Sequence, residues 1–185
     1  MARLTLVAVW FALCLAGCSQ GSGKPEPAQG PGQNPAIDVC FSPKGGCTEA
    51  VVREITAAKS SILVQAYSFT STPIAEALRD AHRRGVKVEV ILDKSVWTEK
   101  YSEAVYLLHA GIPTKVDAQH SIAHNKVMVI DGEVVITGSF NFTKAAEEHN
   151  AENLLVIRDK ALAEKYAANW REHAAHSEKY EGKVP

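Results

Sequence analysis

The sequence lacks an excess of either charge. It has 20 Lys and Arg residues and 21 Asp and Glu residues, so the formal net charge is −1 at pH 7. Proteins that bind nucleic acid through much of their surface usually carry a positive excess. The near balance argues against high nonspecific affinity for nucleic acid, but it leaves room for a local basic cleft.

Internal repeats and long apolar runs are also lacking. The chain has 185 residues, of which 46% are hydrophobic, and this suits one globular domain with a substantial core. A mostly apolar segment at residues 4–15 is too short for a stable helix across a membrane. The sequence therefore predicts a single domain behind a short N-terminal leader.

The leader has the features of an export signal. Arg3 precedes the apolar residues, and the leader ends in Leu15-Ala16-Gly17-Cys18, which resembles the cleavage box of bacterial lipoproteins. The resemblance implies that residues 1–18 are a signal peptide and that an acylated Cys18 anchors the protein to a membrane. The alternative is an ordinary signal peptide, which releases a soluble periplasmic or secreted protein. Both interpretations predict export from a bacterial cytoplasm.

Two regions follow the leader. Residues 19–36 are rich in Gly, Pro, Gln and Ser and predict a flexible tether, whereas residues 37–185 predict the folded domain. The domain keeps two of the four cysteines, Cys40 and Cys47, on either side of a Pro and Gly turn. Outside the cytoplasm we expect a Cys40–Cys47 disulfide. A metal site is the alternative, but two isolated thiols are a poor zinc set.

Helix and strand patterns alternate along the domain. The apolar spacing and capping residues predict helices at residues 48–59, 72–84, 99–110 and 159–174. Strands are expected at residues 61–67, 86–92, 112–116, 127–130, 133–137 and 153–157. This order predicts an α/β fold in which a mixed β-sheet is sandwiched by helices, with parallel crossovers first and one antiparallel hairpin later.

Chemically useful side chains gather around that hairpin. Residues 127–130 form a short β-branched run, and Asp131-Gly132 is a strong hairpin signal. Side chains alternate along a strand, so His124 and Lys126 share a face at the start of the hairpin. Ser139 and Asn141 share a face at its end. An ammonium and two neutral donors suit phosphate oxygens, and the imidazole can attack or donate a proton.

The same residues carry a resemblance to the phospholipase D superfamily. His124, Lys126 and Asp131 match its His-x-Lys-x4-Asp signature, and residues 138–141 match Gly-Ser-x-Asn. Residues 66–70 and 138–147 more specifically resemble small bacterial endonucleases of that superfamily. The resemblance implies phosphodiester hydrolysis through a phosphohistidine, with no metal and no cofactor.

The superfamily uses two His-x-Lys motifs in each active site, whereas this chain has one. The resemblance therefore implies a homodimer with one active site between the subunits. It also implies that Glu152 is the carboxylate that orients His124. Asp131 lies five residues after Lys126, on the opposite face of an extended strand, so we expect a structural role for it.

The expected function is a nonspecific endonuclease that hydrolyses DNA or RNA. A phospholipid hydrolase or transferase of the same superfamily and a non-enzymatic polyanion-binding protein are the alternatives. Lys94, Lys115 and Lys144 are candidates for the rim of a nucleic-acid cleft. Trp97 is interpreted as a packing residue, with stacking on a base as the alternative. His120 lies four residues before His124, but the segment between them does not look helical, so a zinc pair is not favoured. The remaining histidines, including His173 and His176, are interpreted as surface or helix-face residues.

Overall fold

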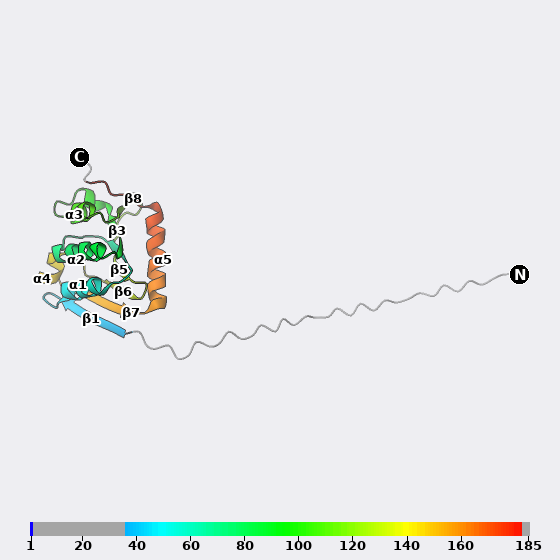
Figure 1. Cartoon of the computed structure of the whole chain (residues 1–185), viewed down its shortest axis with the longest axis horizontal. Helices are drawn as coiled ribbons and strands as arrows, with labels where there is room; N and C mark the ends of the chain where they lie inside the picture. Colours follow the sequence, from blue (N-terminus) through cyan, green and yellow to red (C-terminus); the bar gives the residue numbers. More distant parts are fainter. Residues whose placement is uncertain (2–35, 183–185) are drawn as a thin grey trace. The chain divides into compact units, whose positions relative to one another are not determined.

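The domain has three layers. Apart from Met1, the structure, a computed structural model, describes residues 36–182. Helix α5 (Lys160–His176) covers one face of a β-sheet, and helices α1 (Cys47–Ala57), α2 (Thr72–Arg83) and α3 (Ala104–His109) cover the other (Figure 1). The predicted α/β sandwich is confirmed. The predicted signal peptide and all of the predicted tether except Ala36 lie outside the described residues.

The sheet is mixed, as predicted. Its strands follow the order β1-β7-β6-β5-β2-β3-β4-β8. Strand β3 pairs in parallel with β2 and β4, and the remaining neighbours are antiparallel. The bounds are β1 Ala36–Ser42, β2 Ser61–Ala66, β3 Lys87–Asp93, β4 Thr114–Asp117, β5 Lys126–Ile130, β6 Val134–Gly138, β7 Glu152–Arg158 and β8 Glu178–Lys179.

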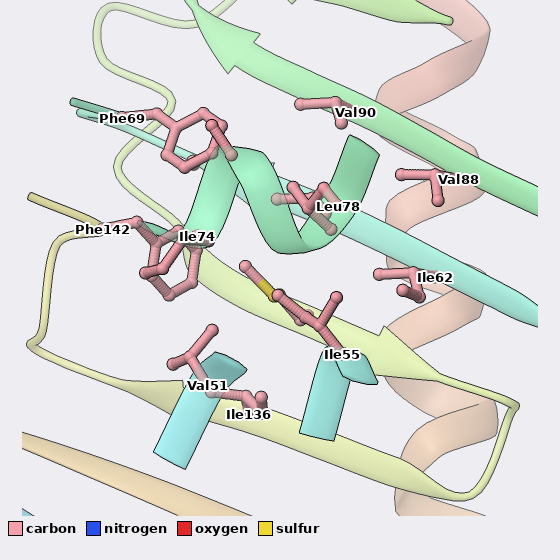
Figure 2. Close-up of a cluster of buried hydrophobic side chains, with 14 of the residues drawn as sticks. Val51, Ile55, Ile62, Phe69, Ile74, Leu78, Val88, Val90, Ile136 and Phe142 are labelled. Atoms are coloured by element: carbon pink, nitrogen blue, oxygen red, sulfur yellow. The ribbon is translucent and has the colours of Figure 1, made fainter. Parts of the chain in front are cut away.

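Each face of the sheet has its own apolar cluster. Figure 2 shows part of the larger one, where side chains of α1 and α2 such as Ile55 and Leu78 pack over Ile62 and Val90 of the sheet. The smaller cluster joins β5 and β6 to Ala163 and Ala167 of α5. Because both faces are covered, the central strands β2, β3 and β5 are mostly apolar.

The helix predicted at residues 99–110 is wrong in its first half. The structure has a short 3₁₀ helix, η1 (Lys94–Trp97), and α3 begins only at Ala104. A helix from residue 99 would bond the Glu103 N–H to the carbonyl of residue 99. Instead, this N–H donates to the carbonyl of Phe69 at 2.9 Å. A long-range contact has therefore replaced a local one and leaves residues 98–103 as a loop.

Besides η1, three elements are not in the sequence prediction: β1, β8 and helix α4 (Lys144–Glu148). A side chain of helix α4 caps the N-terminus of α1. The Glu147 carboxylate accepts hydrogen bonds from the backbone N–H groups of Gly46 at 3.0 Å and Thr48 at 2.7 Å. The cap is supplied from about a hundred residues away, so no local pattern could reveal it.

Among the described residues, no helix combines the length and apolar character needed to cross a membrane.

The hairpin between β5 and β6 turns at Asp131-Gly132, as predicted. Both residues have positive φ, 54° and 68°, which is the geometry that a tight hairpin turn requires. Glu133 is not yet in the returning strand, because its N–H closes the turn on the carbonyl of Ile130 at 3.0 Å. Strand β6 therefore starts one residue later than predicted, at Val134.

The Asp131 side chain fastens the turn to the loop before β2. Its carboxylate accepts hydrogen bonds from the backbone N–H groups of Lys59, Ser60 and Ser61, at 2.7 to 3.0 Å. Burial by itself raises the pKa of Asp131, but these hydrogen bonds outweigh burial and lower that pKa below its usual range. The carboxylate is therefore ionised and serves the fold at this turn.

Replacing Asp131 by Asn should lower the free energy of unfolding by about 1–3 kcal/mol at pH 7, because the charge-assisted hydrogen bonds weaken. Asn tolerates the left-handed backbone, so the turn itself is kept. The folded pKa is lowered, so the stabilisation is present above the unfolded value of about 3.9 and is lost as pH falls through the folded value. Urea unfolding of wild type and variant across this pH range measures the difference in the free energy of unfolding, with Glu133→Gln as the control. A difference that does not shrink on acidification would contradict this account.

Candidate active site

Apart from Asp131, the predicted site residues meet at one end of the sheet. Strand pairing places Ala66, the last residue of β2, opposite Lys126, the first of β5. Gly138 ends β6 opposite Leu154, two residues after the start of β7 at Glu152. His124, Ser139 and Asn141 lie in the loops just outside these strand ends. The ends of β2, β5, β6 and β7 therefore form one edge of the sheet. The sequence predicted this proximity for the residues at the two ends of the hairpin.

Lys126 is the buried cation of this edge, with 7% of its surface exposed. Its Nζ donates to the carbonyl of His124 at 2.8 Å and lies 4.9 Å from the ring centre of Tyr67. Burial lowers the pKa of Lys126, and the negative charge of Glu152 partly opposes that effect. A desolvated ammonium that retains free N–H donors binds an anionic oxygen more strongly than an exposed one.

His124 is exposed and is held in place by an aromatic neighbour. The Tyr67 and His124 rings are 4.7 Å apart, tilted by 53°. The backbone N–H of Tyr67 also donates to the carbonyl of Asn125 at 2.9 Å. One tyrosine thus contacts both members of the His-x-Lys pair. The resemblance of residues 66–70 to small bacterial endonucleases had singled out this segment in the sequence. It did not show that Tyr67 contacts His124 and Lys126.

The loop that carries His124 is anchored from behind by Asp93, a residue that the sequence analysis did not identify. Asp93 is buried, and its carboxylate accepts hydrogen bonds from Ala123 N at 2.7 Å and Ser95 N at 2.8 Å. The first contact fixes the residue just before His124. Nothing in the local sequence links residues 93 and 123, because the link depends on the sheet bringing β3 beside this loop.

Ser139 holds β6 to β7. Its hydroxyl accepts a hydrogen bond from the backbone N–H of Asn153 at 3.1 Å, and the side chain of Asn153 lies 3.4 Å away. Gly138 permits this close approach, because a Cβ there would lie 2.3 Å from the carbonyl oxygen of Asn153. Its φ of 148° also disfavours other residues. The Gly-Ser pair therefore fixes where the following Asn141 comes.

Asn141 offers an unpaired polar atom. Its Oδ1 is buried and has no hydrogen-bond partner among the described residues. A buried polar atom without a partner costs free energy unless a ligand satisfies it. Rotation of the amide exchanges this acceptor for an N–H donor. Asn141 is therefore able to bind either a donor or an anionic oxygen at the sheet edge.

The negative charge of Glu152 partly offsets the lowering of the Lys126 pKa by burial. The Glu152 carboxylate accepts a hydrogen bond from the side chain of Asn150 at 3.2 Å. Within the described residues, His124 has no hydrogen bond or ion pair to a carboxylate. The role of Glu152 in orienting His124 therefore stays a prediction. Asp131, by contrast, is committed to the turn at the other end of β5.

The three lysines proposed for a cleft rim have other contacts. Lys94 Nζ donates to the carbonyl of His120 at 2.9 Å, and Lys115 Nζ to that of Ala174 at 2.7 Å. Lys144 lies 3.6 Å from Glu148. Trp97 is partly buried and packs against the larger core cluster, so the packing role predicted for it is the one that its surroundings support.

The two cysteines of the domain are adjacent free thiols. Cys47 is buried at the start of α1, and Cys40 lies on β1. Burial raises the pKa of the Cys47 thiol, and a hydrogen bond with Cys40 raises it further. The predicted disulfide is not formed in the structure, and oxidation to a Cys40–Cys47 bond stays a prediction.

Comparisons with known proteins agree with this geometry. The family model described as "Cardiolipin synthase, PLD-like domain" matches residues 51–174. A Rickettsia typhi protein named "Phospholipase D" is 46% identical over 134 residues, which are 72% of this chain and 66% of that protein. A dog protein named "Mitochondrial cardiolipin hydrolase" is 31% identical over 151 residues, 79% of this chain and 59% of its own length. The chain thus spans about two thirds or less of these two relatives.

A solved structure is similar over its whole length. Nuc from Salmonella typhimurium, described as a phospholipase D family member, superposes with a TM-score of 0.77 at 39% identity. The match covers 80% of this chain and 100% of Nuc. The part of this chain that the match covers is about as long as the described domain. The common fold therefore includes the sheet edge that carries His124 and Lys126. Family model, relative and fold agree that this chain belongs to the phospholipase D superfamily.

Proposed function

We propose that the protein is a metal-independent endonuclease that hydrolyses phosphodiester bonds of DNA or RNA through a phosphohistidine. The observation that carries the proposal is the exposed His124 imidazole beside the buried Lys126 ammonium at one sheet edge. A phosphodiester hydrolase needs a nucleophile that can reach phosphorus and a positive charge that binds its oxygens. These two residues supply both from positions two apart.

The reaction proceeds in two displacements. A ring nitrogen of one His124 attacks phosphorus, and the bond from phosphorus to the leaving oxygen breaks as the partner subunit's His124 gives that oxygen a proton. The partner's His124 then takes a proton from water, and the resulting hydroxide attacks phosphorus and breaks the P–N bond. An acid or base at this position contributes roughly 10²–10⁴-fold to the rate.

The surrounding residues bind and position. Lys126 and the Asn141 amide hold the nonbridging oxygens, where negative charge grows in the transition state. Ser139 fixes the loop through Asn153, as its hydrogen bonds indicate. The negative charge of Glu152 opposes the lowering of the Lys126 pKa by burial. In this proposal the Glu152 carboxylate also accepts a hydrogen bond from the second ring nitrogen of His124.

A homodimer completes the site. The chain has one His-x-Lys motif, and the mechanism needs two histidines in different protonation states. Two large apolar side chains are exposed at the same sheet end: Ile122 is 57% exposed and lies two residues from His124, and Phe41 is 65% exposed at the end of β1. Their burial against a second copy would remove apolar surface from water and bring the two sites together.

A nucleic-acid substrate is favoured by the loop at residues 98–103. Tyr101 is 73% exposed, and Lys100 Nζ lies 5.3 Å from its ring centre. This loop lies beside the site, because Glu99 accepts a hydrogen bond from the hydroxyl of Ser68, the neighbour of Tyr67, at 3.0 Å. An exposed aromatic ring with an adjacent cation can stack on a base while the ammonium contacts the backbone.

A phospholipid substrate is the second candidate. The observation in its favour is the similarity to relatives named "Phospholipase D" and "Mitochondrial cardiolipin hydrolase". A membrane-anchored Cys18, as the leader suggests, would bring the domain near lipid and would place it in the periplasm. The same chemistry would then cleave a headgroup phosphodiester.

Replacing His124 by Ala should reduce plasmid cleavage by about 10³-fold or more, because the nucleophile and the proton donor are the same residue. Replacing the exposed His149 should leave the rate unchanged. Wild-type protein that remains folded in excess EDTA, as judged by circular dichroism, should still cleave. Loss of cleavage in folded, EDTA-treated protein would contradict the metal-free mechanism. Hydrolysis of cardiolipin vesicles without plasmid cleavage would favour the lipid candidate.

Replacing Tyr101 by Ala should weaken binding to single-stranded DNA by about 1–3 kcal/mol, the value of one base stack. Tyr101→Phe keeps the ring and should bind like wild type. Neither change should affect hydrolysis of a small aryl phosphodiester, which has no base to stack. Equal affinity of Tyr101→Ala and wild-type protein for DNA would remove this loop from the binding surface.

Mixed dimers test the shared site. Equal amounts of wild type and His124→Ala, unfolded and refolded together, should retain roughly a quarter of the wild-type activity if each site needs both histidines. Independent monomers would retain about half.

Sedimentation should give twice the mass of the chain, and Ile122→Glu should shift the protein toward monomer with parallel loss of activity. An active monomer would overturn the shared site.

A further inference from the structure

Three histidines and one aspartate converge away from the His124 edge. Asp117 ends β4, His120 lies in the following loop, and His173 and His176 are one turn apart near the end of α5. One ligand atom from each residue can be chosen so that all four lie within 4.8 Å of one another. The sequence analysis placed the last two histidines on a helix surface, because only the fold brings them to Asp117.

The carboxylate lies at the centre of the cluster. Asp117 Oδ2 is 2.7 Å from His173 Nδ1, 3.0 Å from His120 Nδ1 and 3.3 Å from His176 Nε2. In a tetrahedral zinc site with metal–ligand distances of about 2.0–2.1 Å, neighbouring ligand atoms are about 3.3 Å apart. The three nitrogens thus surround the oxygen at close to the spacing that a shared metal ion imposes.

The three imidazole rings lie close to one another. Their ring centres are 4.9, 5.3 and 5.4 Å apart in the three pairs. Asp117 is fully buried, whereas the side chains of His173, His176 and His120 are 15%, 26% and 44% exposed. The cluster is therefore closed on the side of the sheet and open to solvent at His120, which gives an ion a way in.

The surrounding hydrogen bonds hold the ligands in place. The second carboxylate oxygen, Oδ1, accepts from the backbone N–H of Gln119 at 3.1 Å. Lys94 of η1 and Lys115 of β4 donate to the carbonyls of His120 and Ala174, so the two segments that carry the histidines are held by neighbouring elements. Contacts of this kind orient metal ligands before the ion binds.

The donor set selects the class of ion. Calcium and magnesium take oxygen ligands, and this cluster offers three imidazole nitrogens and one carboxylate. Imidazole and carboxylate together suit Zn²⁺, and four protein ligands leave no open position for a reacting water. The chemistry is that of a structural site rather than a catalytic one.

We propose that Asp117, His120, His173 and His176 bind one divalent transition-metal ion, with Zn²⁺ as the preferred ion. The ion joins the end of β4, the loop at residues 118–125 and the end of α5. That loop leads into Ala123 and His124, so metal binding stabilises the backbone that carries the proposed nucleophile. The ion takes no part in phosphodiester cleavage, and the site stands whether or not the proposed reaction is correct.

The test is a metal titration of the full chain after EDTA treatment and removal of the chelator. Calorimetry with Zn²⁺ should give one equivalent per chain, and Co²⁺ should develop the visible absorption of a tetrahedral site. At a free Zn²⁺ concentration of 100 times Kd, Tm should rise by roughly 5–10 °C. His173→Ala and His176→Ala should each lose the Tm rise and the Co²⁺ absorption, whereas His149→Ala should keep both.

Absence of saturable binding to folded wild-type protein would overturn the proposal, as would a Tm rise and Co²⁺ spectrum that survive in both variants. If a variant fails to fold, the wild-type titration and His120→Gln, which changes the most exposed ligand, decide the question. Plasmid cleavage measured on the same samples separates the two proposals. A metal-free protein that is less heat-stable but still cleaves at low temperature supports both, whereas cleavage that strictly follows bound metal would contradict the metal-free mechanism.

Discussion

Strand β5 is buried at every residue, between β2 on one side and β6 on the other. Met128 and Ile130 join the cluster under α1 and α2, while Val127 and Val129 join the cluster under α5. A shift of the strand by one residue would exchange these two sets and move Lys126 to the opposite face. The apolar packing of β5 therefore determines which way the ammonium points, and the rest of the site depends on that register.

This dependence explains why burying a lysine is tolerated. A desolvated ammonium is costly unless its donors are satisfied. Lys126 has the carbonyl of His124, the Tyr67 ring and the charge of Glu152 around it, each from a different segment. Those three contacts leave donor capacity for a substrate oxygen. The Lys126 ammonium is thus stabilised without a ligand and is still available to bind an anionic one.

The sequence predicted much of this arrangement, and the failures have a common cause. Local patterns located the hairpin at Asp131-Gly132, the helix caps such as Asp159 and the residues that meet at the sheet edge. The larger errors involve contacts between distant residues. Glu103 donates to Phe69 and shortens a helix, Glu147 caps α1, and Asp93 anchors Ala123. The cluster around Asp117 is the clearest case, because no spacing rule joins residues 117 and 173.

Strand β1 has a consequence for how the domain folds. It pairs along its whole length with β7, from Ala36 opposite Arg158 to Ser42 opposite Glu152. The first strand of the domain thus has no partner until nearly all of the chain has left the ribosome. Pairing across so long a loop is entropically slow. Ile37, Val39 and Phe41 remain solvent-exposed even after pairing, so the nascent chain presents an apolar, unpaired strand during synthesis.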